Sequence, residues 1–83
     1  MDTPASESEP LVYDTQDRAC GGELLEEIDA WAAPLEPGRV VLIVNADPAA
    51  PLDLRAWAGR RGHTYLGPRD YEGRPAYAIR KEN

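Results

Sequence analysis

Cys20 is the only cysteine in this chain of 83 residues, and it stands directly before two glycines in the stretch RACGGELLEEIDAW. A thiol attacks, or accepts a sulfur atom, as the thiolate. The residues from Glu23 onward read as an amphipathic helix, so the thiol would lie at a helix N-terminus. Unpaired N–H groups and the helix macrodipole favour an anion there by about 0.3 to 1 kcal/mol. We therefore expect an exposed and modestly activated thiol.

The residues beside Cys20 form the helix N-terminus that would support this chemistry. Gly21 and Gly22 carry no Cβ and would let a partner's sulfur approach the backbone N–H groups closely. Arg18 would assist a thiolate, and nearby acids would oppose it; these are Asp17, Glu23, Glu26 and Glu27. The alternative interpretation is a buried cysteine that acts as a small hydrophobic residue. Exposure and reactivity of the thiol distinguish the two.

Few other residues offer chemistry. His63 is the only histidine and follows Gly62, so we expect a turn or packing residue and not a catalytic base. Trp31 and Trp57 lie on apolar helix stripes and are expected in the core. One cysteine allows no internal disulfide, and the spacings of zinc sites, Walker loops and dinucleotide folds are absent. We expect no metal and no cofactor.

The net charge of −6 is unevenly distributed along the chain. Up to Gly38 there are ten acidic residues against Arg18 alone, and from Arg39 onward eight basic residues face five acidic ones. Such asymmetry can steer the docking of a partner. The acidic total argues against general nucleic-acid binding.

The length and composition indicate one small domain. A chain of this size holds one thin core and no deep cavity. Residues 1–9 combine Pro, Ser, Thr and acids and predict a disordered acidic tail, which leaves residues 10–83 as the single domain. The lone cysteine fits a reducing, cytoplasmic setting, and no stretch resembles a signal peptide or a membrane span. We expect no membrane partner.

The first half of the domain predicts a strand, a helix and a second strand. Residues 10–14 form a short β-favouring run. Apolar residues then recur at helical spacing; they are Leu24, Leu25, Ile28, Trp31, Ala32 and Leu35. This stripe predicts a helix from about Cys20 or Gly21 to Ala33, where proline follows. Residues 39–45, with five consecutive aliphatic residues, predict a strand that is covered on both faces or central in a sheet.

The second half predicts a helix and a hairpin. The helix begins either at Asp47, as an N-cap, or in the stretch APLD at 50–53, and it ends near Gly59 or Gly62. Residues 63–80 alternate on either side of a glycine turn and predict two antiparallel strands. The order β-α-β-α-β-β predicts a two-layer sandwich of the α/β (α+β) class. Both helices would lie on one face of a four-stranded mixed sheet.

Several short fragments occur in order along residues 11–81. They are the spacing D-x5-C from Asp14 to Cys20, L-x-P-G at 35–38, A-D-P-A at 46–49, D-L-x-x-W at 53–57, G-H at 62–63 and I-R-K at 79–81. Together these fragments resemble the TusA/SirA family of small sulfur-carrier proteins. The resemblance implies a fold like the C-terminal domain of translation initiation factor 3, in agreement with the order of elements above.

The resemblance also implies a function for Cys20. In that family the matching cysteine receives a persulfide from a donor protein, such as a cysteine desulfurase or a rhodanese, and passes the sulfur to an acceptor protein. Such relays feed tRNA thiolation, molybdenum cofactor assembly or sulfur oxidation, and a monomer is expected. The family's Cys-Pro-x-Pro reads here Cys20-Gly21-Gly22-Glu23. Glycine loosens this turn, and Glu23 adds a negative charge to it.

Two other functions are compatible with the sequence. One is a docking or regulatory module of the same fold without sulfur transfer, which the residues Gly21 and Glu23 favour. The other is an RNA-binding module that would use basic residues of the C-terminal half, if these converge on one face. These bases are Arg55, Arg60, Arg61, Arg69, Arg74, Arg80 and Lys81.

Overall fold

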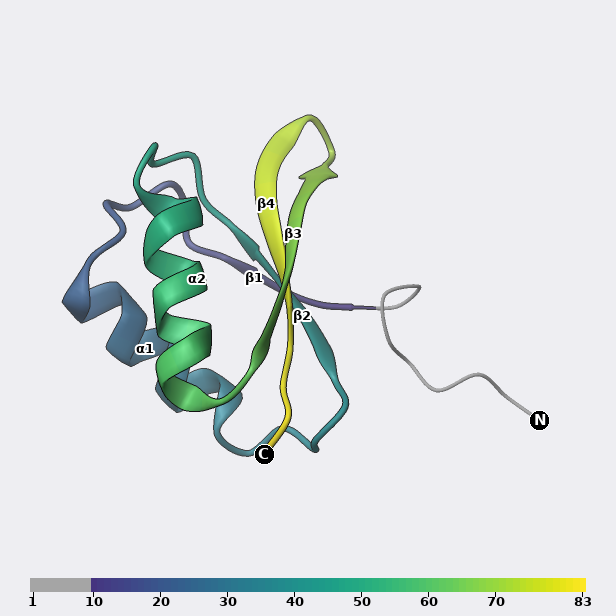
Figure 1. Ribbon diagram of the computed structural model, residues 1–83. Coiled ribbons are helices and arrows are strands. Elements are labelled where there is room, and N and C mark those ends of the chain that lie inside the picture. Colours follow the sequence, from purple (N-terminus) through teal and green to yellow (C-terminus); the bar gives the residue numbers. More distant parts are fainter. Residues whose placement is uncertain (1–9) are drawn as a thin grey trace.

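A computed structural model describes residues 10–83, and the predicted tail at residues 1–9 lies outside the described residues. The described chain forms two layers, a twisted sheet and a pair of helices (Figure 1). The elements in chain order are β1 (Leu11–Asp14), α1 (Gly22–Ala32), β2 (Val40–Val44), α2 (Ala50–Arg61), β3 (Thr64–Tyr71) and β4 (Arg74–Arg80).

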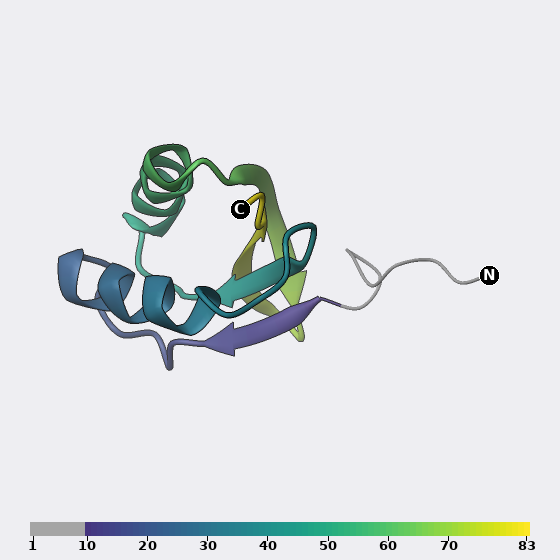
Figure 2. The ribbon, with the colours of Figure 1, turned by 90° about the horizontal axis from the view of Figure 1, so that it is seen from below.

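The sheet has the order β1-β2-β4-β3. β1 pairs with β2 in parallel, and β4 is antiparallel to both of its neighbours, β2 and β3. Both helices lie on the same side of the sheet (Figure 2). The predicted two-layer sandwich with a four-stranded mixed sheet is therefore confirmed.

The core lies between the sheet and the helices. Val41 and Ile43 of β2 and Tyr77 and Ile79 of β4 contribute from the sheet side. The helices contribute Leu24, Ile28, Ala50, Leu54, Trp57 and Ala58. All five residues of β2 are buried, as a central strand requires. Burial of this apolar face is the main favourable term in fixing the helices on the sheet.

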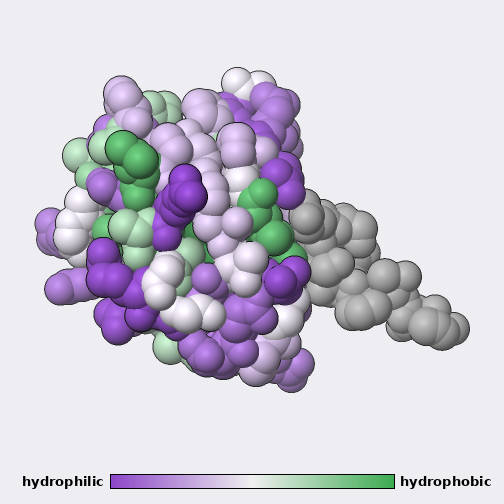
Figure 3. Space-filling model, viewed as in Figure 1, coloured by the Kyte–Doolittle hydropathy of each residue, from purple (hydrophilic) through white to green (hydrophobic). Residues whose placement is uncertain are grey.

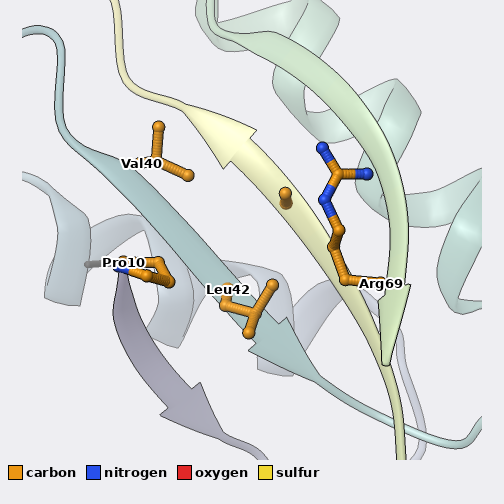
Figure 4. Close-up of a pocket in the computed structure, with 5 residues that line it drawn as sticks. Pro10, Val40, Leu42 and Arg69 are labelled. Carbon is orange, nitrogen blue, oxygen red and sulfur yellow. The ribbon is translucent and has the colours of Figure 1, made fainter. Parts of the chain in front are cut away.

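The other sheet face carries a smaller apolar cluster, formed by Val40, Leu42, Val44, Ala76 and Ala78. Pro10, Val40, Leu42 and Arg69 line a pocket of about 80 Å³ there (Figure 4). This pocket is small, in keeping with the expectation of a thin core.

The helix boundaries differ slightly from the prediction. α1 begins at Gly22, with Gly21 as its N-cap, and it ends at Ala32. α2 begins at Ala50, the later of the two predicted starts. Gly62 ends α2 in the left-handed conformation, with φ of 77°, which glycine adopts at little cost.

Lys81 is a buried cation and not a surface residue. Its Nζ donates hydrogen bonds to the carbonyl oxygens of Ala33 and Leu35, which follow α1. Carbonyl groups at a helix C-terminus lack intrahelical partners, so a lysine satisfies them well. The expectation that Lys81 belongs to a basic surface is therefore wrong.

Candidate functional site

The predicted nucleophile lies at the edge of the sheet where β1 and β2 end. These adjacent strands are parallel, so the loops that follow them start at the same edge. Residues 15–21 lead from β1 to α1, and residues 45–49 lead from β2 to α2. Ligands of α/β sheets commonly bind outside the carboxyl ends of strands. Hydrogen bonds between the two loops build the site.

Asn45 joins the two loops from inside the protein. Its side chain is fully buried, and its Nδ2 donates to Thr15 Oγ1 and to the Arg18 carbonyl oxygen, at 2.8 Å each. Its Oδ1 accepts the backbone N–H of Asp47 at 2.7 Å. Thr15 Oγ1 in turn donates to the Val44 carbonyl at 2.6 Å. A buried network of this kind fixes one loop geometry when every member is satisfied.

Asp47 links this network to Cys20. Its Oδ2 accepts the backbone N–H of Cys20 at 2.7 Å, and its Oδ1 accepts the N–H of Ala49 at 2.9 Å. Its carbonyl oxygen accepts the N–H of Ala50, at the start of α2. The backbone hydrogen bonds from Ala49 and Cys20 lower the pKa of Asp47. One ionised carboxylate therefore holds the segments in front of both helices.

The Cys20 side chain is half-buried and packs against the main core cluster. The carboxylate of Asp53, in the first turn of α2, lies near the thiol. Burial raises the pKa of Cys20 to about 11, and the negative charges of Asp53 and Asp47 act in the same direction. The thiol is therefore protonated at neutral pH, and the expected modest activation is wrong. Burial is the largest cause, and the two carboxylates near the start of α2 add to it.

Arg18 does not serve the thiol. Its guanidinium forms a two-pronged ion pair with Glu27, with N–O distances of 2.7 and 2.9 Å. The negative charge of Glu27 thereby neutralises the single base of the acidic half of the chain. Glu23, in the first turn of α1, is exposed.

Gly21 and Gly22 border open space. A Cβ built on either residue would meet nothing within 4 Å. Gly21 is fully extended, with φ of −171°, a conformation open to any residue. Internal packing therefore does not require these glycines, and the backbone at the start of α1 is accessible from outside.

Trp31, Trp57 and His63 pack against other residues of the protein. Trp57 is buried, and Trp31 is half-buried against the ring of Tyr13, with the ring centroids 4.9 Å apart. The His63 ring lies 5.4 Å from that of Trp57, and its Nδ1 accepts the backbone N–H of Glu82. Burial lowers the pKa of His63 and favours the neutral ring. These contacts agree with a structural role.

Several of the predicted surface bases are engaged within the protein. Arg61 pairs with Asp29 at 3.0 Å. Arg74, at the start of β4, pairs with Asp14 and with Asp17, at 2.7 and 3.3 Å. Arg80 pairs with Glu82, and Lys81 is buried. These contacts reduce the free positive charge that an RNA surface would use.

Residues 10–83 contain no group of three or more His, Cys, Asp or Glu side chains placed to hold a metal ion. Within the same range no helix has the length and apolar character needed to cross a membrane.

Sequence reasoning missed the partners of Cys20 in the second loop. Asp47 and Asp53 both follow the aliphatic strand β2; by type Asp47 predicts only a helix N-cap, and Asp53 lies in the alternative helix start at 50–53. The available signal was their position directly after a central strand, where polar side chains meet those of a neighbouring parallel strand. No known family model matches the chain, and no curated protein sequence matches it.

Proposed function

We propose that the chain is a sulfur carrier that accepts a sulfur atom on Cys20 and passes it on. The observation that carries this proposal is the placement of Cys20. Its thiol is half-buried beside Asp53, two residues before α1, next to open backbone at Gly21 and Gly22. The resemblance to the TusA/SirA family supports the same role.

The proposed step is an exchange of sulfur between two thiols. The Cys20 thiolate attacks the outer sulfur of a donor persulfide, a new S–S bond forms on Cys20, and the S–S bond of the donor breaks. The donor leaves as a thiolate and takes up the proton that Cys20 loses. The exchange is Cys20–SH plus R–S–SH giving Cys20–S–SH plus R–SH, and it needs no external oxidant or reductant.

The high pKa of Cys20 determines when this exchange occurs. With a pKa of about 11 the thiolate is scarce at neutral pH, so the free carrier resists random alkylation and oxidation. The nearby charge of Asp53 helps to keep the thiol protonated until a donor is bound. Transfer therefore depends on a bound persulfide whose leaving thiolate takes up the proton that Cys20 loses.

The glycines would serve the loaded state. A persulfide places its outer sulfur about 2 Å beyond the first, one S–S bond further from the backbone. At the start of α1 that sulfur can lie over Gly21 and Gly22, where no side chain blocks the backbone N–H groups. Such groups at a helix N-terminus favour an anion.

The proposed partners are proteins. A donor of the cysteine desulfurase or rhodanese class would load Cys20, and an acceptor protein in tRNA thiolation, molybdenum cofactor assembly or sulfur oxidation would receive the sulfur. The reducing cytoplasm is the proposed setting. These assignments come from the family resemblance.

Mass spectrometry tests the proposal directly. After incubation with a cysteine desulfurase and cysteine, the intact protein should gain about 32 Da, one sulfur atom, on the Cys20 peptide. Cys20→Ser is the matched control and should gain nothing. Absence of the adduct from the native protein, under conditions where the desulfurase itself is loaded and a known acceptor takes the sulfur, would refute the carrier function.

A second candidate is a docking or regulatory module of the same fold without sulfur transfer. The raised pKa of Cys20 favours it, because a thiol that stays protonated need not react. This candidate predicts that Cys20→Ser binds the same partner proteins as the native chain with equal affinity and that neither form is loaded with sulfur.

A further inference from the structure

A groove of about 190 Å³ runs between the two helices, close to the start of α1. Residues of α1 form one wall and residues of the second half of α2 form the other; they are Gly22, Leu25 and Glu26, and Trp57, Arg60 and Arg61. Gly22 stands two residues after Cys20. The groove therefore begins next to the proposed site.

The α2 wall carries an exposed cation, Arg60, beside the buried indole of Trp57. Trp57 is only 2 % exposed, and its indole Nε1 has no hydrogen-bond partner. Arg60 lies one turn further along α2 and is exposed, and it forms no ion pair with any residue of the described range 10–83. Arg61, by contrast, is held by Asp29. The unpaired guanidinium of Arg60 suits a carboxylate, whereas the indole Nε1 itself is closed to solvent.

The α1 wall carries the opposite charge. Glu26 lines the groove, is exposed and forms no ion pair within the described part of the chain. Between the charged groups the lining is apolar, from Leu25 and the Trp57 ring. On the face shown in Figure 3, hydrophilic side chains dominate and the apolar patches are small and separate. A negative charge on one wall and a positive charge on the other, with an apolar lining between them, are complementary to a small zwitterion with an ammonium group and a carboxylate.

The spacing along α2 sets the length of the ligand. Asp53, which lies near the Cys20 thiol, precedes Trp57 by four residues and Arg60 by seven. At 1.5 Å per residue these separations are about 6 and 10 Å. In extended cysteine persulfide the carboxylate and the outer sulfur are about 6 Å apart, and the flexible Arg60 side chain can cover the remainder. A groove of about 190 Å³ has room for one amino acid.

We propose that this groove binds a small α-amino acid persulfide, of which cysteine persulfide is the minimal example. Arg60 binds its carboxylate, Glu26 binds its ammonium group, the Trp57 ring lies against its apolar chain, and its outer sulfur points to Cys20. The proposal rests on the sulfur-carrier function and gives it a substrate class. Cys20 attacks the outer sulfur, the S–S bond of the ligand breaks, and free cysteine leaves with the proton from Cys20. Sulfur then reaches the carrier without a protein donor.

Binding is tested without sulfur chemistry, with S-methyl-L-cysteine as an unreactive probe. In Cys20→Ser protein the Trp57 indole N–H signal, assigned in NMR spectra through Trp57→Phe, should shift on titration with this probe. S-methylcysteamine, which lacks only the carboxylate, should bind at least about ten-fold more weakly. Arg60→Gln should weaken binding of the amino acid to a similar degree. Arg55→Gln, at an exposed arginine of α2 outside the groove, should leave it unchanged.

Transfer is tested with cysteine persulfide and cysteamine persulfide on the native chain. Arg60→Gln should raise the apparent KM for cysteine persulfide by about ten-fold and leave the rate with cysteamine persulfide unchanged. An unshifted indole signal, or equal use of both persulfides by the native chain, would overturn the groove proposal. If the desulfurase still loads Cys20 in that case, the carrier function stands. If nothing loads Cys20 although the probe binds, the carrier function fails and the groove remains a binding site.

Discussion

The starts of the two helices are built in opposite ways. Before α2 stand Asp47, which accepts the N–H of Ala49, and prolines that limit the backbone. Neither helix has a side-chain cap, and two glycines stand before α1. The acceptor for the Cys20 N–H comes from the other loop, again from Asp47. The start of α1 is thus positioned by the start of α2.

This difference explains the state of the thiol. The segment before α1 depends on Asp47 of the neighbouring loop, so the half-buried thiol also lies near the carboxylates of Asp47 and Asp53. The same Asp47 that orders Cys20 also disfavours its thiolate, and Asp53 adds to that effect. Order at this site is obtained at the cost of reactivity.

Removal of Asn45 should have the largest effect on stability, because its side chain joins the loops before both helices. Asn45→Ala leaves Thr15 Oγ1, the Arg18 carbonyl and the Asp47 N–H without their buried partner. We expect a loss of about 2 to 4 kcal/mol in the free energy of unfolding, measured by urea denaturation. Asn83→Ala removes an exposed amide and should change it by less than about 0.5 kcal/mol. Similar losses in the two variants would contradict the role of Asn45.

Asp53→Asn should change the thiol and leave the fold intact. Without this charge the pKa of Cys20 should fall from about 11, and alkylation by iodoacetamide at pH 8 should become about ten-fold faster for a fall of one unit. Glu23→Gln removes a carboxylate from the first turn of α1 and is the matched control, with little change expected. An alkylation profile that Asp53→Asn leaves unmoved would show that Asp53 does not restrain Cys20.

The raised pKa also predicts how stability depends on pH. The unfolded thiol, with its pKa near 9.0, loses its proton before the folded one. Between about pH 9 and 11 the folded state therefore binds more protons, and the stability from the protonated thiol is lost as pH rises. Urea unfolding at several pH values should show a steeper fall for the native chain than for Cys20→Ser, and Asp53→Asn should reduce the difference between them.

The smallest effect on stability is expected from substitution of Gly22, which is compared with the same substitution at Gly62. Gly22→Ala adds a Cβ in open space at the first residue of α1 and should raise stability by up to about 0.5 to 1 kcal/mol. Gly62→Ala, at the end of α2, places a Cβ at positive φ and 3.3 Å from Asn83 Nδ2, so it should lower stability. The midpoint of urea unfolding measures both. A loss from Gly22→Ala would mean that α1 needs glycine for its backbone.

The sequence was sufficient for the elements and their layering. The aliphatic run of β2 predicted a central strand, and the apolar stripe of α1 predicted a helix that packs on the sheet, because both depend on local periodicity. The choice between two starts of α2 could not be made, since Asp47 is a good N-cap by type. In the structure Asp47 turns the preceding loop, and the helix begins three residues later, at Ala50.

The site was predicted only in part. The identity and helix-start position of Cys20 were readable from the sequence, but its pKa was not. Asp47 and Asp53 are 27 and 33 residues away along the chain, and they come near only through the parallel pairing of β1 with β2. The expected support of the thiol by Arg18 was wrong for a similar reason. The Arg18 guanidinium pairs with Glu27, nine residues further along the chain.

Lys81 has a consequence for the order in which the protein assembles. It satisfies the carbonyl groups behind α1, and its own carbonyl oxygen accepts the N–H of Gly38, while β4 fills the centre of the sheet. A chain emerging during synthesis therefore has Cys20 long before it has the strand and the lysine that complete the surroundings of α1. Until then the thiol has neither its burial nor its carboxylate neighbours, and the nascent chain is the form most open to oxidation.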